Sequence, residues 1–330
     1  MMVFVIHFIR IFSPAFLSNE IVNSPLKFLI DGDAAVLYFF ILSGFVLTKS
    51  IQNTKISVNS YLKFSGRRFL RIYPAFLLTL LLTFSLFPLF TQTDAASWLN
   101  GFWKTYPGTK GLWEQAILIY RIPNDPSLRL LPHDLTLSVE MVISLLLPLL
   151  VLLSRKSVWL TVILTYIAVR VLPIDPFVLF FALGVLIAFQ GEFLKEQWKK
   201  LSLFGHVIFA ILAVLIIEAE TLSVGFSRIL DLILINHKAW GMAFLLMGLI
   251  SSESIQKLLC INSLNFLGKI SYSFYLWHFV ILAILFQNSS YTNPLANFGL
   301  SLMLTLVVST LSFFLIERPF LLLSKKWLKD

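Results

Sequence analysis

Cysteine and charge are both scarce in this chain. Cys260 is the one cysteine in 330 residues, which excludes an internal disulfide and a cysteine-ligated metal cluster. Charged residues make up 13% of the sequence, compared with about 25% in an average soluble protein. The chain also lacks a Walker-type glycine loop, a Gly-x-Ser-x-Gly elbow and a His-x-x-x-His pair. We therefore expect neither ATP-driven transport nor α/β-hydrolase chemistry, and no metal site.

Hydrophobic residues dominate the rest of the sequence. They make up 58% of the chain, 32 residues are phenylalanine, and the mean hydropathy is +0.86. This composition predicts an integral membrane protein. The formal net charge of +9 comes from basic residues in short gaps between apolar runs. That pattern orients membrane helices, so nucleic acid is not an expected partner.

Windows of about 20 apolar residues predict an all-α, polytopic transmembrane bundle of about ten helices. The predicted spans are 1–17, 34–51, 70–90, 136–153, 158–173, 176–190, 203–218, 230–250, 270–286 and 297–316. The first is expected to be a retained helix, because no basic region precedes it and no signal-peptide cleavage site follows it. Its short length and the internal Arg10 suggest a truncated amino terminus.

The chain is predicted to form one integral membrane domain over residues 1–330, without a fused soluble domain. The longest polar stretch covers residues 91–135. Placing both termini in the cytoplasm puts most lysines and arginines in cytoplasmic gaps, as the positive-inside rule requires. The expected location is therefore the inner (cytoplasmic) membrane. The least regular span is 230–250, which Asp231, His237 and Lys238 interrupt.

Five ionisable residues lie in or against these apolar segments: His7, Arg68, Arg71, Glu140 and His278. A charged side chain at the bilayer centre costs about 2.5–3.5 kcal/mol on insertion scales. Such residues usually pair inside the bundle or act on a substrate. They indicate a membrane enzyme or a transporter.

The basic pair Arg68 and Arg71 is three residues apart, which places both guanidinium groups on one face of a helix. Planar bidentate donors at a helix entrance suit phosphate or pyrophosphate. The alternative is that the pair anchors the helix to lipid headgroups on the cytoplasmic side.

His7 and Glu140 are the residues that we predict to be catalytic. A neutral imidazole at membrane depth can act as a general base on a hydroxyl, although packing is an equal alternative for His7. Glu140 is the one acidic residue inside its apolar stretch. It can orient a base, bind a sugar hydroxyl or pair with an arginine. The adjacent His133 and Asp134 are expected in a solvated loop.

Other polar residues are weaker candidates for lining the site. Ser271, Tyr275 and His278 share one face of a predicted helix and should point inward. Ser43 and Gly44 lie deep in the second span, where close helix packing is the favoured explanation. Near 317, a local Glu317–Arg318 ion pair and Pro319 are expected to end the last helix.

In order along the chain, these segments resemble the acyltransferase 3 family of integral membrane acyltransferases. The resemblance covers nearly the whole sequence. The motifs that carry it are His7, Phe39-Phe40-Ile41-Leu42-Ser43-Gly44-Phe45, Arg67-Arg68-Phe69-Leu70-Arg71-Ile72-Tyr73-Pro74, Leu137-Ser138-Val139-Glu140, Ser271-Tyr272-Ser273-Phe274-Tyr275-Leu276-Trp277-His278 and Glu317-Arg318-Pro319. Each motif is weak alone, but the set in this order is specific.

The resemblance implies transfer of an acyl group, usually acetyl from acetyl-CoA, to a hydroxyl of a surface polysaccharide or another carbohydrate or glycolipid acceptor. His7 matches the family's proposed catalytic histidine. Arg68 and Arg71 match its Arg-x-x-Arg pair, which implies contact with the acyl donor. Acyl-CoA would be a co-substrate rather than a bound cofactor, and membrane lipid surrounds the protein. Some relatives carry an extracytoplasmic domain, so a separate partner protein is a further expectation.

The sequence departs from the family pattern at two places. The arginine and glycine that usually precede the histidine by about ten residues are not present, and Thr136 stands where the family usually has tryptophan. Two alternatives to the enzyme remain open. One is a transporter or exporter of a glycan or lipid-linked intermediate, and the other is an inactive truncated relative.

Overall fold

The computed structural model describes residues 1–12, 25–89, 102, 106–118, 129–288 and 293–327. Within these ranges all regular secondary structure is helical, which confirms the all-α prediction. The chain forms two compact units, and each draws on separate parts of the sequence. The first unit contains residues 1–20, 62–141 and 263–330, and the second contains residues 21–61 and 142–262.

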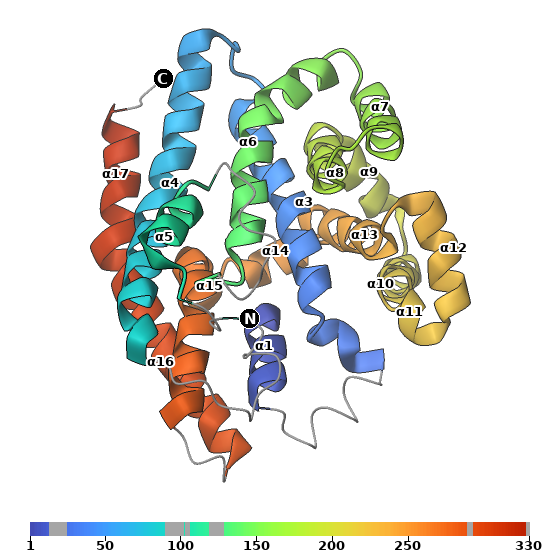
Figure 1. Ribbon diagram of the computed structural model, residues 1–330. Coiled ribbons are helices and arrows are strands. Elements are labelled where there is room, and N and C mark those ends of the chain that lie inside the picture. Colours follow the sequence, from blue (N-terminus) through green and yellow to red (C-terminus); the bar gives the residue numbers. More distant parts are fainter. Residues whose placement is uncertain (13–24, 90–101, 103–105, 119–128, 289–292, 328–330) are drawn as a thin grey trace. The chain divides into compact units, whose positions relative to one another are not determined.

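The first unit is built around α1 (Met2–Phe12), α4 (Val58–Leu86), α5 (Gly108–Ala116), the first turns of α6 (Asp134–Ser154) and α15 (Asn262–Asn288). It also holds α16 (Pro294–Ser312), the π-helical turn η5 (Phe313–Glu317) and α17 (Arg318–Trp327). Figure 1 shows these helices by label. The 3₁₀ turn η2 (Phe87–Leu89) follows α4.

An aromatic core holds α1 in place. Phe4, Phe8 and Ile11 are buried against α15, where Phe279 and Leu282 are also buried. Residues 4, 8 and 11 recur at helical spacing, so they occupy one face of α1, and His7 shares that face. Burying a phenylalanine side chain contributes roughly 1.5–3 kcal/mol. Packing against α15 therefore holds the short α1 in place, and this fixes the position of His7.

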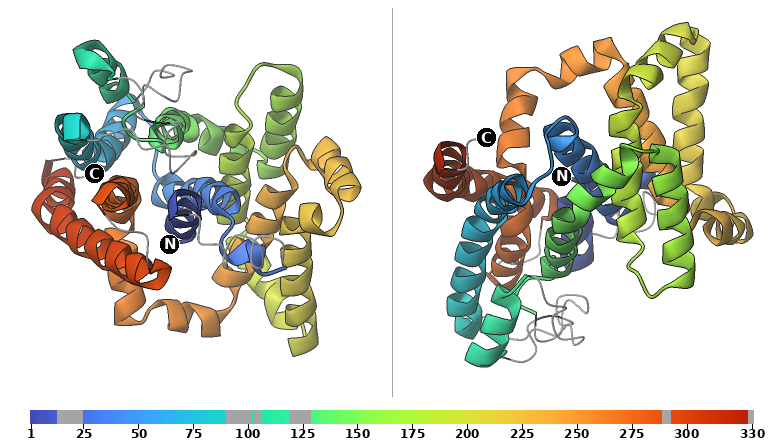
Figure 2. Two further views of the ribbon diagram at one scale, coloured as in Figure 1. Left: turned by 60° about the horizontal axis from the view of Figure 1, so that its bottom comes forward. Right: turned by 90° about the horizontal axis from the view of Figure 1, so that it is seen from above.

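The second unit contains the remaining helices. They are α3 (Gly32–Ile51), the rest of α6, α7 (Val158–Val171), α8 (Phe177–Phe189), α9 (Gly191–Lys200), α10 (Leu203–Ile217), α11 (Ala219–Leu222), α12 (Val224–Leu234), α13 (His237–Ser251) and α14 (Glu253–Leu259), with the 3₁₀ turn η1 (Pro25–Leu29) before α3. The two further views in Figure 2 show α10 and α13 alongside each other in yellow and orange.

Two glycines allow α3 and α8 to pack closely. A Cβ atom on Gly44 would lie 2.3 Å from the carbonyl oxygen of Phe181, and one on Gly184 would lie 2.1 Å from the carbonyl oxygen of Ile41. Neither space admits a side chain, so each glycine lets one backbone rest on the other. This contact supports the packing explanation for Gly44.

Among the described residues, five helices are long and apolar enough to cross a membrane: α3, α4, α6, α15 and the continuous 34-residue segment Pro294–Trp327. Two bent pairs, α8 with α9 and α12 with α13, raise this number to seven if each pair is one span. In the same part of the chain, three apolar helices are shorter: α1, α7 and α10. All ten predicted segments therefore contain a helix, but five to seven of them meet the length for a span.

Several boundaries differ from the predicted ones, and three of the differences bear on the argument. Helix α4 begins at Val58 rather than at 70, so both arginines lie inside it. The segment 230–250 is broken between α12 and α13, which meet at an angle of 76°. At this break Ile235 has a φ of 70°, an uncommon conformation for a β-branched residue. Finally, Pro319 does not end the last helix, because α17 continues to Trp327.

Candidate functional site

A pair of histidines forms the centre of the candidate site in the first unit. His7 on α1 and His278 on α15 approach through Nδ1 of His7 and Nε2 of His278, 2.9 Å apart. The Nδ1 atom of His278 lies 2.6 Å from the carbonyl oxygen of Tyr275. The structure thus brings together two of the predicted residues, although 271 positions separate them in the sequence.

The backbone carbonyl defines which ring nitrogens carry hydrogen. A carbonyl oxygen can only accept, so Nδ1 of His278 must donate to it. In a neutral His278 the other nitrogen, Nε2, then accepts, and Nδ1 of His7 donates to it. In a neutral His7 the lone pair is consequently on Nε2. This tautomer can take a proton from a hydroxyl group.

His133 completes a cluster with this pair, and its position corrects the prediction of a solvated loop. The His133 ring centroid is 5.5 Å from that of His278 and 4.9 Å from that of Tyr275. His133 is 4% exposed and Asp134 is fully buried. Burial, together with the neighbouring His278, lowers the pKa of His133 well below its usual range. The imidazole is therefore neutral at pH 7.

Thr136 and Tyr275 hold the start of α6 against α15. The Thr136 hydroxyl lies 2.5 Å from the Tyr275 hydroxyl and donates to the carbonyl oxygen of His133, 2.7 Å away. Thr136 is the residue that departs from the family pattern. Its short side chain makes a specific polar contact here, and Tyr275 lies beside the histidine cluster.

Both arginines of α4 form ion pairs with buried glutamates. Arg68 binds Glu140 on α6, and Nη1 of Arg71 lies 2.6 Å from Oε1 of Glu317 in η5. The Ser273 hydroxyl donates to the other oxygen of Glu317 at 3.1 Å. Removing one partner of a buried ion pair leaves the charge of the other uncompensated, so the two residues within each pair depend on each other.

The pairing changes the electrostatic account of the two arginines. Each positive charge is balanced by one carboxylate, so the four side chains together carry no net charge. Arg71 remains the more open of the two, with 32% of its side chain exposed against 12% for Arg68. It also lies over the ring of Tyr272, 5.7 Å from the ring centroid. Arg71 is therefore the more accessible of the two arginines.

Three site predictions need correction or separate treatment. Glu317 pairs with Arg71 and not with Arg318, whose guanidinium lies over the Phe314 ring. Ser271 is exposed and donates to the carbonyl oxygen of Gly268, so it does not face inward. Ser43 lies half-buried in α3 of the second unit, whereas the histidine cluster is in the first.

Four residues of the candidate site were not predicted as site residues from the sequence: His133, Thr136, Tyr272 and Ser273. A usable signal was present for two of them. Positions 133, 136 and 140 are separated by three and four residues, which places them on one helical face with Glu140. The contacts of Tyr272 and Ser273 could not be read locally, because their partners Ile72 and Glu317 are distant in the sequence.

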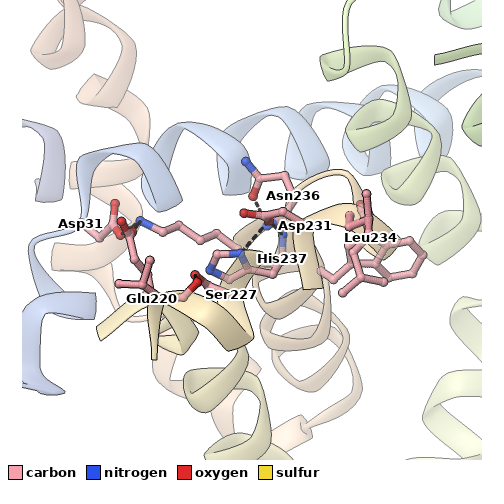
Figure 3. A network of polar contacts seen from close by, with 12 residues as sticks. Asp31, Glu220, Ser227, Asp231, Leu234, Asn236 and His237 are labelled. Atoms are coloured by element: carbon pink, nitrogen blue, oxygen red, sulfur yellow. Dashed lines mark hydrogen bonds and ion pairs between the residues drawn. The ribbon is translucent and has the colours of Figure 1, made fainter. Parts of the chain in front are cut away.

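The second unit contains a separate polar network (Figure 3). Nζ of Lys238 is 2.7 Å from Asp31 and 3.6 Å from Glu220, while Nδ1 of His237 is 2.7 Å from Asp231. Asp31 caps α3 by accepting from the N–H of Ala34. Burial alone would raise the pKa of Asp31, but hydrogen bonds from Lys238 and Ala34 outweigh it and lower that pKa.

These helices and their buried ionisable cluster define an integral membrane protein of the polytopic helical class. A family model described as an acyltransferase domain matches residues 1–315. The chain belongs to this acyltransferase 3 family, as its motifs predicted. Neither the curated proteins nor the solved structures contain a significant match. Within the described residues, no group of three or more His, Cys, Asp or Glu side chains is arranged to hold a metal ion.

Proposed function

We propose that the protein is a membrane O-acyltransferase that moves an acyl group, in the first instance acetyl, from acyl-CoA to a hydroxyl of a surface polysaccharide or another carbohydrate acceptor. The observation that carries the proposal is the His7–His278 hydrogen bond, which leaves the lone pair of His7 on Nε2. Family membership supports acyl transfer in general. The proposed location is the inner membrane, with both termini in the cytoplasm.

In the proposed reaction, Nε2 of His7 removes the proton of the acceptor hydroxyl while the oxygen attacks the thioester carbonyl carbon. The C–O bond of the ester forms as the C–S bond of the thioester breaks. The thiolate of coenzyme A leaves and takes up the proton that His7 holds. General base catalysis of this kind contributes roughly 10²–10⁴-fold to the rate. His278 holds the His7 ring and its tautomer throughout.

The proposed donor site uses Arg68 and Arg71. Arg71, the more exposed of the two, donates N–H groups to a phosphate of coenzyme A, and the aromatic ring of Tyr272 lies against its guanidinium. Glu140 contributes by holding Arg68, to which it is bound. This role refines its assignment as a catalytic residue, because Glu140 then acts on the donor site through the arginine.

A transporter remains the second candidate, and one observation bears on it. Transporters often use broken helices in corresponding positions of two repeated halves. The protein has two bent helix pairs, α8 with α9 and α12 with α13. Both pairs lie in the second unit. They therefore do not occupy matching positions in two halves, and the acyltransferase is the better supported function.

The test is the acetyl content of surface glycan, measured by mass spectrometry in cells that lack the gene and in cells complemented with native or His7→Ala protein. We expect deletion to remove the acetyl group and only the native protein to restore it. In parallel, purified native protein should release free coenzyme A from acetyl-CoA when glycan from the deletion strain is added. Movement of an unmodified glycan without coenzyme A release would instead establish the transporter.

A further inference from the structure

His133 stands out because its polar atoms are buried without use. The side chain precedes α6 and is 4% exposed, yet neither ring nitrogen has a hydrogen-bond partner among the residues that the structure describes. Leaving a buried polar atom unsatisfied costs about 1–3 kcal/mol. Buried polar groups in folded proteins are paired in the large majority of cases. Two such atoms on one side chain indicate that a ligand supplies the partners.

The surroundings of His133 place that ligand at the histidine cluster. Its ring lies beside His278, which is hydrogen-bonded to His7, and beside Tyr275. The backbone at His133 is also held in place, because the Thr136 hydroxyl donates to the carbonyl oxygen of His133 and contacts Tyr275. A side chain held in this way is positioned before the ligand arrives, which lowers the entropy lost on binding.

The chemistry of a neutral imidazole narrows the class of ligand. One nitrogen donates a hydrogen and the other accepts one, and the two lie on different edges of the ring. A thioester carbonyl can only accept, so it would satisfy one edge and leave the other nitrogen unpaired. Hydroxyl groups both donate and accept. A molecule with several hydroxyls, such as a sugar, can therefore satisfy both edges.

We propose that His133 binds the hydroxyl-bearing acceptor beside His7. The assignment rests on the proposed acyltransferase function and extends it to an acceptor-binding residue that no motif had indicated. His133 orients the acceptor, while His7 removes the proton from the reacting hydroxyl. A sugar can meet both edges of the ring with one molecule, whereas water would need two separate molecules.

The test measures the KM for each substrate separately with purified full-length protein. Acetyl-CoA is the donor, and unacetylated surface polysaccharide from the deletion strain is the acceptor. His133→Phe keeps the ring contacts with Tyr275 and His278 but removes both nitrogens. We expect the KM for polysaccharide to rise about 10-fold, as for loss of a hydrogen bond to a buried group. The KM for acetyl-CoA should stay unchanged. His133→Gln, which offers a donor and an acceptor, should recover most of the native value.

A matched control is His237→Phe, because His237 is equally buried but belongs to the second unit. It should leave the KM for polysaccharide unchanged, whatever it does to stability. His133→Leu provides a second apolar variant if the phenylalanine does not fold. An unchanged polysaccharide KM in a folded apolar variant, or a rise in the acetyl-CoA KM instead, would overturn the assignment. No transfer by the native protein would overturn the proposed function itself and His133's role with it.

Discussion

The two units of this protein use ionisable residues in different ways. In the second unit Asp31 and Asp231 act at helix ends: Asp31 caps α3, and Asp231 accepts from the backbone N–H of His237 beside the break before α13. In the first unit His7, Arg68 and Glu140 lie within helices and bind other side chains. Capping residues satisfy backbone groups that every helix leaves open. Polar residues within apolar helices have no such structural need, and this difference favours the first unit as the place of the proposed chemistry.

The most direct test of this difference between the units is removal of the proposed base, His7. We expect His7→Ala to lower acyl transfer roughly 10²–10⁴-fold, because general base catalysis is lost. Coenzyme A release from acetyl-CoA is the measurement. His206→Ala is the matched control, since His206 contacts Trp198 within the second unit. An equal loss of activity in both variants would contradict the assignment of chemistry to the first unit.

Loss of a single buried charge should have the next largest effect. Glu140→Ala leaves Arg68 without its carboxylate, and we expect the free energy of unfolding to fall by about 3–5 kcal/mol. The double variant Arg68→Met with Glu140→Met should lose much less, because no charge is left unpaired. Denaturation in detergent measures both. If the double variant were as unstable as the single one, the unpaired charge of Arg68 would not explain the destabilisation of Glu140→Ala.

His278 tests the orientation of the base. We expect His278→Phe to lower kcat about 10-fold to 100-fold, since Nδ1 of His7 then loses its acceptor and the tautomer is no longer held. His278→Gln retains an oxygen that can accept this hydrogen and should recover part of the rate. The pH profile separates this role from packing, because loss of the acceptor alters the basicity of His7. An unchanged kcat in the phenylalanine variant would refute the orienting role.

In the second unit the sharpest test is a packing change. Gly184→Ala places a Cβ atom 2.1 Å from the carbonyl oxygen of Ile41, so α3 and α8 must separate. We expect destabilisation of about 1–3 kcal/mol, as for overpacking elsewhere. Gly299→Ala is the control, because a Cβ atom there meets nothing within 4 Å. Equal stability of the two variants would argue against close contact between α3 and α8.

The smallest expected effect concerns the capping residue Asp31. Its lowered pKa means that the folded protein binds the proton less readily than the unfolded chain, so its stabilisation is present above the unfolded pKa of about 3.9. That stabilisation is lost as the pH falls through the folded value. Asp31→Ala should cost about 0.5–2 kcal/mol at pH 7 through the lost cap, because Lys238 keeps a second carboxylate, that of Glu220, 3.6 Å away. Glu192→Gln, at an exposed position, should show no comparable loss of stability.

Some predictions from the sequence depended on local information and others did not. Apolar run lengths located a helix in each of the ten predicted spans, because the pattern of hydrophobic residues is local. The break near Ile235 was visible only as an irregularity at Asp231, His237 and Lys238, which in the structure form the polar network at that break. His133 was assigned to solvent because its sequence neighbours resemble a loop. Its burial arises from α15, which lies more than a hundred residues later.

Composition and ordered motifs are enough to predict the class of the protein, its family and the presence of ionisable residues in apolar helices. The partners of those residues became known from the folded structure alone. Arg71 meets Glu317 across 246 positions and His7 meets His278 across 271. Such pairings depend on how helices pack, and no local pattern encodes that. The same packing buries His133 beside the pair and so turns an apparent loop residue into a candidate for binding the acceptor.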